Sequence, residues 1–184
     1  MKSILTFALT LVLMGCSGTK QVTVETNPRI DYFPGRKKAT VIKSMDIDLD
    51  AKKQILLVPV GNFTLSMVER IGYFDVVLTP DKLEEKIMRE GLADKAHSIA
   101  DETGINIAAK EYQPFLWLRW VNRFDGTRYY VQLVLTDPIL LEDYFVCETH
   151  LDYLRAGVSN RTNWYPMMNS LISYIKRNSK MYGH

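Results

Sequence analysis

The sequence has no apolar run long enough to cross a bilayer, and it has few of the residues that most often carry chemistry. None of its apolar runs reaches the 18 residues that a spanning helix needs, so no such helix is expected. It contains two cysteines and three histidines, and its net charge is only +2. A charge so close to neutral provides no general attraction to nucleic acid, which is not expected as a partner.

Recognisable catalytic and metal-binding patterns are also missing. No two of the histidines (His97, His150 and His184) have the spacing of metal ligands on one helical turn, so no metal site is expected. There is no Gly-x-Ser-x-Gly, no glycine-rich phosphate loop and no Gly-x-Gly-x-x-Gly. The adjacent carboxylate pairs, Glu84-Glu85, Asp101-Glu102 and Glu142-Asp143, point apart on either a helix or a strand. We therefore predict a protein that is not an enzyme and holds no cofactor.

The amino terminus carries the most informative signal. One positive charge at Lys2 precedes the segment from Ile4 to Met14, which is apolar except for Thr6 and Thr10. Eleven residues of helix reach only about 16 Å, against about 30 Å of hydrocarbon. The segment is therefore too short to span a bilayer, but it has the length of the apolar region of a secretory signal.

This segment ends in Leu13-Met14-Gly15-Cys16, which resembles the lipobox of bacterial lipoproteins. The resemblance implies that residues 1–15 are a signal peptide, removed between Gly15 and Cys16. It also implies that the Cys16 thiol carries a diacylglycerol and that the new amine carries a third acyl chain, of the palmitate type. Two or more acyl chains give stable anchoring, whereas one chain holds only marginally. Ser17 stands where an aspartate would retain such a protein at the inner membrane, so the outer membrane is implied, with the chain on its periplasmic side.

After acylation of Cys16, only Cys147 remains as a thiol, and no disulfide within the chain is expected. Cys147 lies in Asp143-Tyr144-Phe145-Val146-Cys147-Glu148-Thr149, a pattern typical of a strand. A buried, small hydrophobic residue is the favoured interpretation, because a single exposed thiol is a liability in an oxidising compartment.

The rest of the chain divides into a flexible tether and a single globular domain. Residues 16–52 contain Asn27-Pro28, Pro34-Gly35 and the basic run Arg36-Lys37-Lys38, and we interpret them as a lipidated tether, with short strands at 21–24 or 40–42. The basic run is interpreted as solvated, the alternative being a position near anionic headgroups. Residues 53–184 are predicted to form an α+β (mixed α/β) domain in which helices pack on a sheet that contains an antiparallel hairpin.

Periodicity predicts the individual elements of this domain. Strands are predicted at 55–60, 73–78, 105–108, 112–121, 128–136 and 142–153, and helices at 63–71, 79–91, 93–102 and from 163 onward. Asp125-Gly126 predicts a tight turn between the two long strands. Leu83, Ile87 and Met88 are predicted on the inner face of one helix, and Gly104 is predicted to end another.

The order of these elements, with Pro59-Val60-Gly61-Asn62-Phe63 after the first strand and Gly72-Tyr73-Phe74-Asp75-Val76-Val77 in the second, resembles a known periplasmic domain type. This type is shared by the curli secretion channel lipoprotein, the TolB amino-terminal domain, and small lipoproteins that activate peptidoglycan synthases or assist polysaccharide export. The resemblance would cover residues 54 to about 180. It implies a binding or assembly module.

Aromatic residues on one predicted strand suggest where binding takes place. Phe115 and Trp117 share one face of the strand, and the opposite face carries Leu118 and Trp120, so both faces are large and apolar. Either helices cover both faces, or one face docks a partner. For the second case we predict a binding surface made of Trp117, Arg119, Trp120, Arg123 and Tyr129.

Together these observations predict a lipoprotein of the outer membrane that serves as a non-catalytic accessory or assembly factor of a cell-envelope machine. The machine would act in secretion, polysaccharide export or peptidoglycan synthesis. The expected partners are the bilayer, an envelope protein and further copies of the chain itself. The alternative is a glycan- or peptidoglycan-binding module that uses the aromatic strand for stacking. A small hydrolase with a dispersed site is the least favoured interpretation.

Overall fold

The computed structural model describes residues 30–35, 37–92, 94, 99–151 and 163–182. The predicted signal peptide, the segment that resembles a lipobox and Cys16 lie outside these residues. The described strands are β1 (Thr40–Ser44), β2 (Ile55–Leu57), β3 (Val76–Leu78), β4 (Leu116–Phe124), β5 (Tyr129–Asp137) and β6 (Glu142–Leu151). The described helices are α1 (Asn62–Ile71), α2 (Pro80–Arg89), α3 (Glu102–Glu111) and α4 (Tyr165–Asn178), with a short 3-10 helix at Asp50–Lys52. No described helix is long and apolar enough to cross a bilayer.

The strands form one mixed sheet in the order β1-β6-β5-β4-β2-β3. β1, β6, β5 and β4 pair antiparallel, whereas β2 pairs parallel with both β4 and β3. The predicted hairpin is confirmed: β4 and β5 are joined at Asp125, whose carboxylate accepts the amide N–H of Thr127 at 3.0 Å and that of Arg128 at 2.8 Å. Gly126 follows with φ +96°, a conformation that glycine adopts without strain. The predicted α+β class is likewise confirmed.

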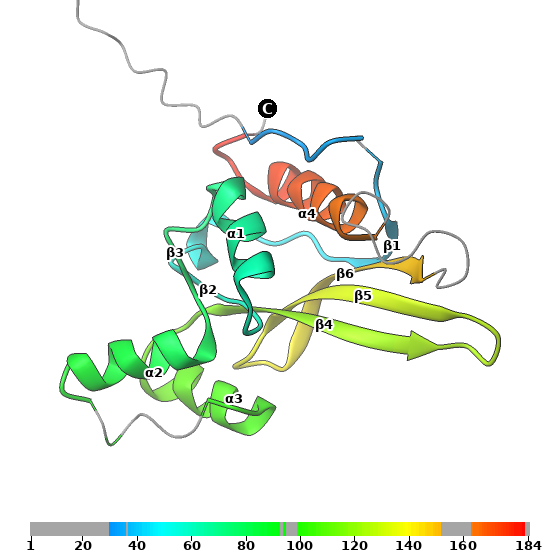
Figure 1. The fold of residues 1–184 in the computed structure, drawn as a ribbon. Coiled ribbons are helices and arrows are strands. Elements are labelled where there is room, and N and C mark those ends of the chain that lie inside the picture. Colours follow the sequence, from blue (N-terminus) through cyan, green and yellow to red (C-terminus); the bar gives the residue numbers. More distant parts are fainter. Residues whose placement is uncertain (1–29, 36, 93, 95–98, 152–162, 183–184) are drawn as a thin grey trace, which may run out of the picture.

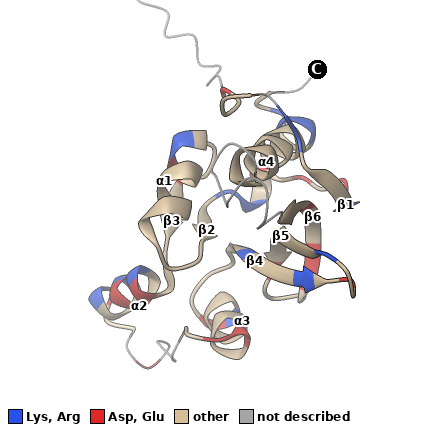
Figure 2. Cartoon of the chain, turned by 45° about the vertical axis from the view of Figure 1, so that its right-hand side comes forward, with Lys and Arg blue, Asp and Glu red and all other residues tan. Residues whose placement is uncertain are grey.

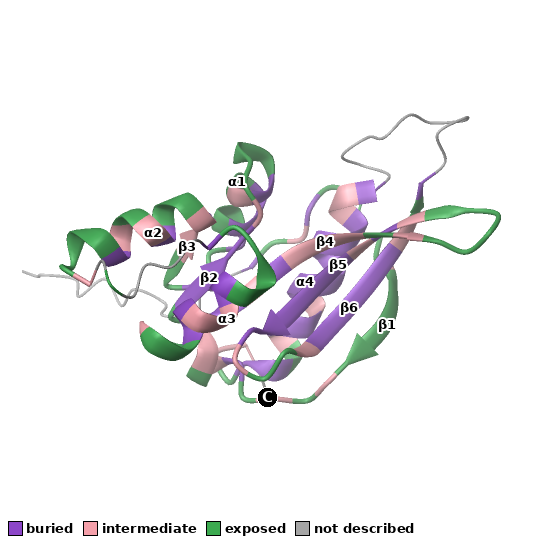
Figure 3. Ribbon diagram, turned by 90° about the horizontal axis from the view of Figure 1, so that it is seen from below, coloured by how far each residue is buried: buried purple, intermediate pink, exposed green. Residues whose placement is uncertain are grey.

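Helices cover one face of the sheet along most of its width and the other face only at one end (Figures 1 and 3). We call the side that carries Leu118, Leu133 and Cys147 the inner face; α1 and α4 pack on it. On the opposite side, α2 and α3 pack on Ile55 and Leu57 of β2. Strand β2 is thus buried on both faces, as its continuous apolar run predicts.

A segment that precedes the sheet crosses the outer side of α4. We call residues 30–35 and 37–50 the strap. Its part before β1 lies above α4 in Figure 1, so that α4 lies between that part and the sheet, whereas β1 is itself an edge strand of the sheet. Asn169 of α4 accepts a hydrogen bond from the Phe33 amide N–H on its Oδ1 at 2.7 Å. Its Nδ2 donates to the carbonyl oxygens of Phe33 and Lys37 at 3.3 and 2.9 Å. Farther along, Asn178 Oδ1 accepts the amide N–H of Ile47 at 2.8 Å.

The strap changes the predicted domain boundary. Ile30, Phe33 and Leu49 are buried in the core, and β1 is an integral strand of the sheet. Residues 30–52, which the sequence assigns to the tether, therefore belong to the folded domain. The prediction missed them because Pro34, Gly35 and the basic run resemble a linker, whereas the apolar residues among them are too sparse to show a period.

A second correction concerns the region around Gly104. The predicted strand at 105–108 is part of α3, and Gly104 lies near the beginning of that helix. Asp101 begins the helix, because its carboxylate accepts the Gly104 amide N–H at 2.8 Å as an N-cap. Ile105, Ala108 and Ala109 then face β2 at helical spacing. Of the helix predicted at 93–102, residues 93 and 95–98 lie outside the described residues, and 99–101 form a turn.

The remaining elements lie close to their predicted positions. Leu83 and Ile87 lie on the buried face of α2, as predicted. The prediction that Met88 shares this face is wrong, since Met88 is 56% exposed. α4 buries the predicted Met167, Leu171, Ile172 and Ile175. Cys147 is buried on β6, as predicted, and burial raises the pKa of its thiol, which disfavours the thiolate.

Candidate functional site

On the side of β4, β5 and β6 that faces away from α4, the described helices reach only the border with β2, where Trp117 packs against the cluster that α2 and α3 form on β2. We call this side the open face (Figure 3). It comprises Trp117, Arg119, Val121 and Arg123 of β4, Tyr130, Gln132, Val134 and Thr136 of β5, and Asp143, Val146, Glu148 and His150 of β6. These residues alternate with the inner-face residues, as the pleat requires. Four of them are nonetheless buried: the apolar Val134 and Val146 and the polar Thr136 and Glu148.

One cluster of these polar side chains is centred on Glu148. Arg123 donates to its carboxylate through Nε and Nη2 at 3.1 and 3.0 Å, and Gln132 Nε2 donates to the same group at 3.0 Å. This bidentate arrangement fixes both side chains more firmly than a single contact would. The hydrogen bond to Glu148 also raises the pKa of Arg123. Glu148 itself is only 9% exposed, so Arg123 and Gln132 replace the solvent that its carboxylate loses on burial.

A second cluster is centred on Asp143. Arg119 Nη2 donates to its carboxylate at 3.0 Å, and Thr136 Oγ1 donates to the same oxygen at 2.7 Å. Arg119 also lies 4.0 Å from Glu102 of α3, which places it at the border between the open face and the helices. Its Nε is buried and has no hydrogen-bond acceptor among the described residues. The two clusters give the face a fixed pattern of opposite charges on neighbouring strands.

Arginines also cover the aromatic rings of the open face. The guanidinium carbon of Arg119 lies 4.9 Å from the ring centre of Trp117, and that of Arg123 lies 4.2 Å from the ring centre of Tyr130. His150 meets the Tyr130 ring edge-on at 5.5 Å. A sugar that stacks on an aromatic ring needs an uncovered ring face. The cation–π contacts therefore occupy surface that a glycan would use.

The structure brings together three of the five predicted surface residues. Trp117, Arg119 and Arg123 share the open face, whereas Trp120 and Tyr129 lie on the inner side of the hairpin. Trp120 Nε1 donates to Thr64 Oγ1 of α1 at 3.0 Å, and its ring meets that of Trp164 at 4.8 Å. Tyr129 lies near the hairpin turn with its ring 4.6 Å from that of Phe124.

Glu148 and Gln132 take part in this face although the sequence reasoning did not single them out. The available signal was alternation: Gln132 lies between the apolar residues Val131 and Leu133, and Glu148 follows the apolar Cys147. Alternation predicts the face that each residue occupies. It does not predict that Arg123 of β4, Gln132 of β5 and Glu148 of β6 meet, because that depends on the register of three strands.

Comparison with known proteins gives no family for the chain. No family model matches it, and no curated protein matches it. Among solved structures, it is similar to the LpoB C-terminal domain from Salmonella enterica, with a TM-score of 0.33 and 14% sequence identity over 55% of this chain and 84% of that one. A likeness at this TM-score assigns neither a family nor a function.

A hollow of about 300 Å³ adjoins the open face at the edge formed by β1 and β6. Its lining includes Tyr130, Glu148 and His150 from the sheet and Lys37 and Lys38 from the strap. The hollow thus connects the open face to the basic part of the strap. His150 is one of the three histidines of the chain; His97 and His184 lie outside the described residues.

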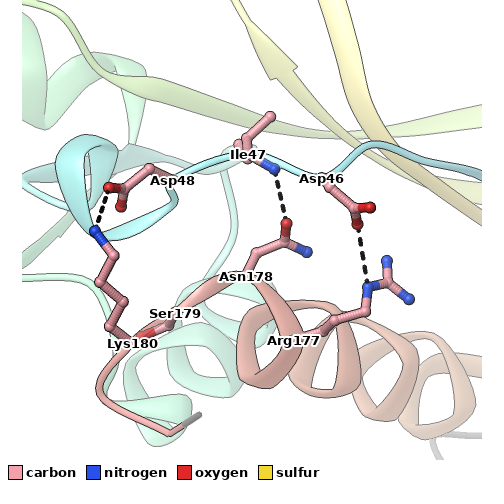
Figure 4. Close-up of a pocket in the computed structure, with 7 residues that line it drawn as sticks. All are labelled: Asp46, Ile47, Asp48, Arg177, Asn178, Ser179 and Lys180. Atoms are coloured by element: carbon pink, nitrogen blue, oxygen red, sulfur yellow. Dashed lines mark hydrogen bonds and ion pairs between the residues drawn. The ribbon is translucent and has the colours of Figure 1, made fainter. Parts of the chain in front are cut away.

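A larger groove of about 650 Å³ lies where the strap meets the end of α4 (Figure 4). The charged side chains that line it are already paired: Asp46 lies 3.6 Å from Arg177, and Asp48 lies 2.9 Å from Lys180. Asp50, nearby, accepts Ser179 Oγ and the Lys180 amide N–H, both at 2.7 Å. Burial acts to raise the pKa of Asp50, but these bonds and that from Tyr73 outweigh it and lower the pKa. The groove is therefore a structural junction.

The three carboxylate pairs noted in the sequence have structural partners. Glu84 accepts the amide N–H of Ile99 at 2.6 Å, Asp101 caps α3, and Asp143 binds Arg119. Within the described part of the chain, no group of three or more His, Cys, Asp or Glu residues is arranged to hold a metal ion.

Proposed function

We propose that this protein is a lipid-anchored accessory factor of a cell-envelope machine, and that it docks a protein partner on its open face. The anchor would be the acylated Cys16 in the periplasmic side of the outer membrane, as the lipobox resemblance implies. No catalytic role is proposed. The secretion, polysaccharide-export and peptidoglycan-synthesis machines remain the three candidates for the partner.

The observation that carries the docking role is the fixed charge pattern on a sheet face that the described helices reach only at its border with β2. Arg119 and Arg123 are held in place by Asp143 and Glu148, so a partner would meet ordered side chains and lose little conformational entropy there. Alternating charges of this kind specify orientation and register in protein interfaces more than they provide affinity. The arginines over Trp117 and Tyr130 weigh against the alternative of glycan stacking.

Site-specific photocrosslinking in living cells tests the docking role. A photoreactive residue at Val121, on the open face between Arg119 and Arg123, is expected to give a discrete protein adduct. The same residue at Glu85, on the exposed side of α2, is the matched control and is expected to give none. An adduct with a second copy of the chain would identify the partner as the protein itself. Carbohydrate adducts at Val121, or equal protein adducts at both positions, would contradict the proposal.

The anchor has a separate test. The variant Cys16→Ala is expected to accumulate as an unprocessed precursor that does not incorporate labelled palmitate. Ser17→Ala leaves the thiol in place and serves as the control for acylation. Normal processing and location of Cys16→Ala would contradict the lipoprotein assignment.

A further inference from the structure

Basic and aromatic side chains gather where the strap begins. Lys38 Nζ and Lys176 Nζ both lie over the ring of Tyr32, at 5.8 and 4.7 Å from its centre. The guanidinium carbon of Arg70 lies 5.0 Å from the ring centre of the next residue, Phe33. The strap, α1 and α4 thus each contribute a cation to one surface, which Figure 2 shows as blue segments of all three elements.

We call Lys37, Lys38, Arg70 and Lys176 the basic cluster. Among the described residues, none of the four has a carboxylate within ion-pair distance, whereas all three cations of α2 (Lys82, Lys86 and Arg89) are paired. The acidic residues next to the cluster in the sequence are Asp31 and Glu69. The local excess is therefore about two positive charges.

From these contacts we propose that the basic cluster binds the anionic headgroups of the membrane that anchors the chain. This inference rests on the proposed lipid anchor. Thirteen residues lie between Cys16 and Ile30, and even fully extended this connection reaches no more than about 50 Å. The cluster lies at the point where this segment enters the fold, so it is the part of the domain that the anchor would keep nearest to the bilayer.

The expected strength of headgroup binding is enough to orient the domain on the membrane but not to anchor it. A Lys or Arg near an anionic surface contributes about 1 kcal/mol, so an excess of two charges gives weak binding that the acyl chains make local. The layers of the fold then set the orientation. The first part of the strap lies outside α4, and α4 lies on the inner face of the sheet (Figure 1). The part of the open face on β4 and β5 would therefore point away from the bilayer, and its edge at β6, next to Lys37 and Lys38, would lie nearest to it.

The test uses the acylated protein, extracted from membranes and inserted by its anchor into vesicles. One set contains only phosphatidylcholine, and the other contains equal parts of phosphatidylcholine and phosphatidylglycerol. Trace labelling with a water-soluble amine reagent is then followed by mass spectrometry. Labelling of Lys37, Lys38 and Lys176 is expected to be several-fold slower on the anionic vesicles, and high salt should abolish the difference. Lys82 and Lys110 should be labelled equally on both.

Charge-reversal variants supply the matched control. With Lys38→Glu and Lys176→Glu combined, the protection of Lys37 on anionic vesicles is expected to disappear. The control combines Lys110→Glu with Arg128→Glu, which changes the net charge by the same amount. Neither Lys110 nor Arg128 has an ion pair among the described residues, and this variant should leave Lys37 protected. Lys38→Gln with Lys176→Gln removes the charges without placing carboxylates on Tyr32 and should give the same loss. Equal labelling on both vesicle types would overturn the inference.

The outcome also separates this inference from the anchor on which it rests. A protein that lacks acyl chains would fail to float with either type of vesicle at high salt. A protein that floats with both types but shows no difference in lysine labelling keeps its anchor and lacks headgroup binding.

Discussion

Asn169 shows how a single residue attaches the strap to the rest of the fold. Its side chain is fully buried, and it satisfies one amide N–H and two carbonyl groups of a segment more than 130 residues earlier in the chain. An extended segment that lies on a helix has no neighbouring strand with which its backbone N–H and C=O groups can pair. A buried backbone group without a hydrogen bond lowers the stability of the fold. The amide of asparagine matches this need because it both donates and accepts.

We therefore expect Asn169→Ala to lower the free energy of unfolding by about 2–4 kcal/mol, since it leaves several buried backbone groups without partners. Urea denaturation measures this quantity. Asn122→Ala, at an exposed position of β4, is the control and should change stability by no more than about 0.5 kcal/mol. Equal effects of the two substitutions would show that Asn169 does not hold the strap.

Asp137 gives a prediction about pH. Burial acts to raise the pKa of its carboxyl, but hydrogen bonds from Lys52 Nζ at 2.9 Å and Tyr144 OH at 2.8 Å outweigh burial, so the pKa is lowered. A carboxyl whose pKa is lower in the folded state stabilises the fold above its unfolded value of about 3.9, and this contribution is lost as the pH falls through the folded pKa.

The free energy of unfolding is accordingly expected to fall below about pH 4, and Asp137→Asn should flatten part of that fall. Chemical denaturation at a series of pH values between neutrality and strong acid measures it. A variant profile that runs parallel to that of the unmodified protein would rule out this role for Asp137.

At the scale of elements, α3 forms because Asp101 caps its amino terminus, although Ile105-Asn106-Ile107-Ala108 within it has the composition of a short strand. Asp101→Ala should lower the free energy of unfolding by about 1 kcal/mol, because it removes the acceptor for the Gly104 amide N–H. Thr103→Ala, an exposed position in the first turn of the same helix, is the control and should have a smaller effect. Thermal or urea unfolding compares the two. A larger loss for Thr103→Ala would contradict the capping role.

Strong local signals predicted most elements correctly. The apolar run of β2, the Asp125-Gly126 turn and the helical spacing of α4 each depend on neighbours in the sequence. The predictions failed where distant residues decide. Ile105-Asn106-Ile107-Ala108 fits a short strand by composition, but Asp101 begins a helix that buries Ile105 and Ala108 on β2. Likewise, the strap is ordered by Asn169 and Asn178, which no local pattern reveals.

The candidate surface was predictable in the same limited sense. Trp117, Arg119 and Arg123 share a face because even numbers of residues, two and then four, separate their positions on one strand, which the sequence shows directly. Trp120 and Tyr129 were grouped with them by composition, and the strand pleat places them on the other side. Glu148 completes the surface from β6, at a position that only the register of the sheet determines.

On the scale of the whole molecule, the layers give the protein two distinct sides. The basic cluster lies on the strap, α1 and the outer side of α4, and most of the paired charges of the open face lie across the sheet from it. The two surfaces meet at the edge formed by β1 and β6, where Lys37 and Lys38 line the same hollow as Glu148 and His150. A lipid anchor ahead of the strap would hold the first side toward the bilayer and leave the second side available to a partner. The anchor is thus the part of the account that gives both surfaces a function.

Mass spectrometry of the native protein, purified from membranes, tests that anchor most directly. The account predicts that the chain begins at Cys16 and that this residue carries the added mass of a diacylglycerol and an amide-linked fatty acid. An unmodified Cys16 thiol, or a chain that still retains residues 1–15, would contradict it.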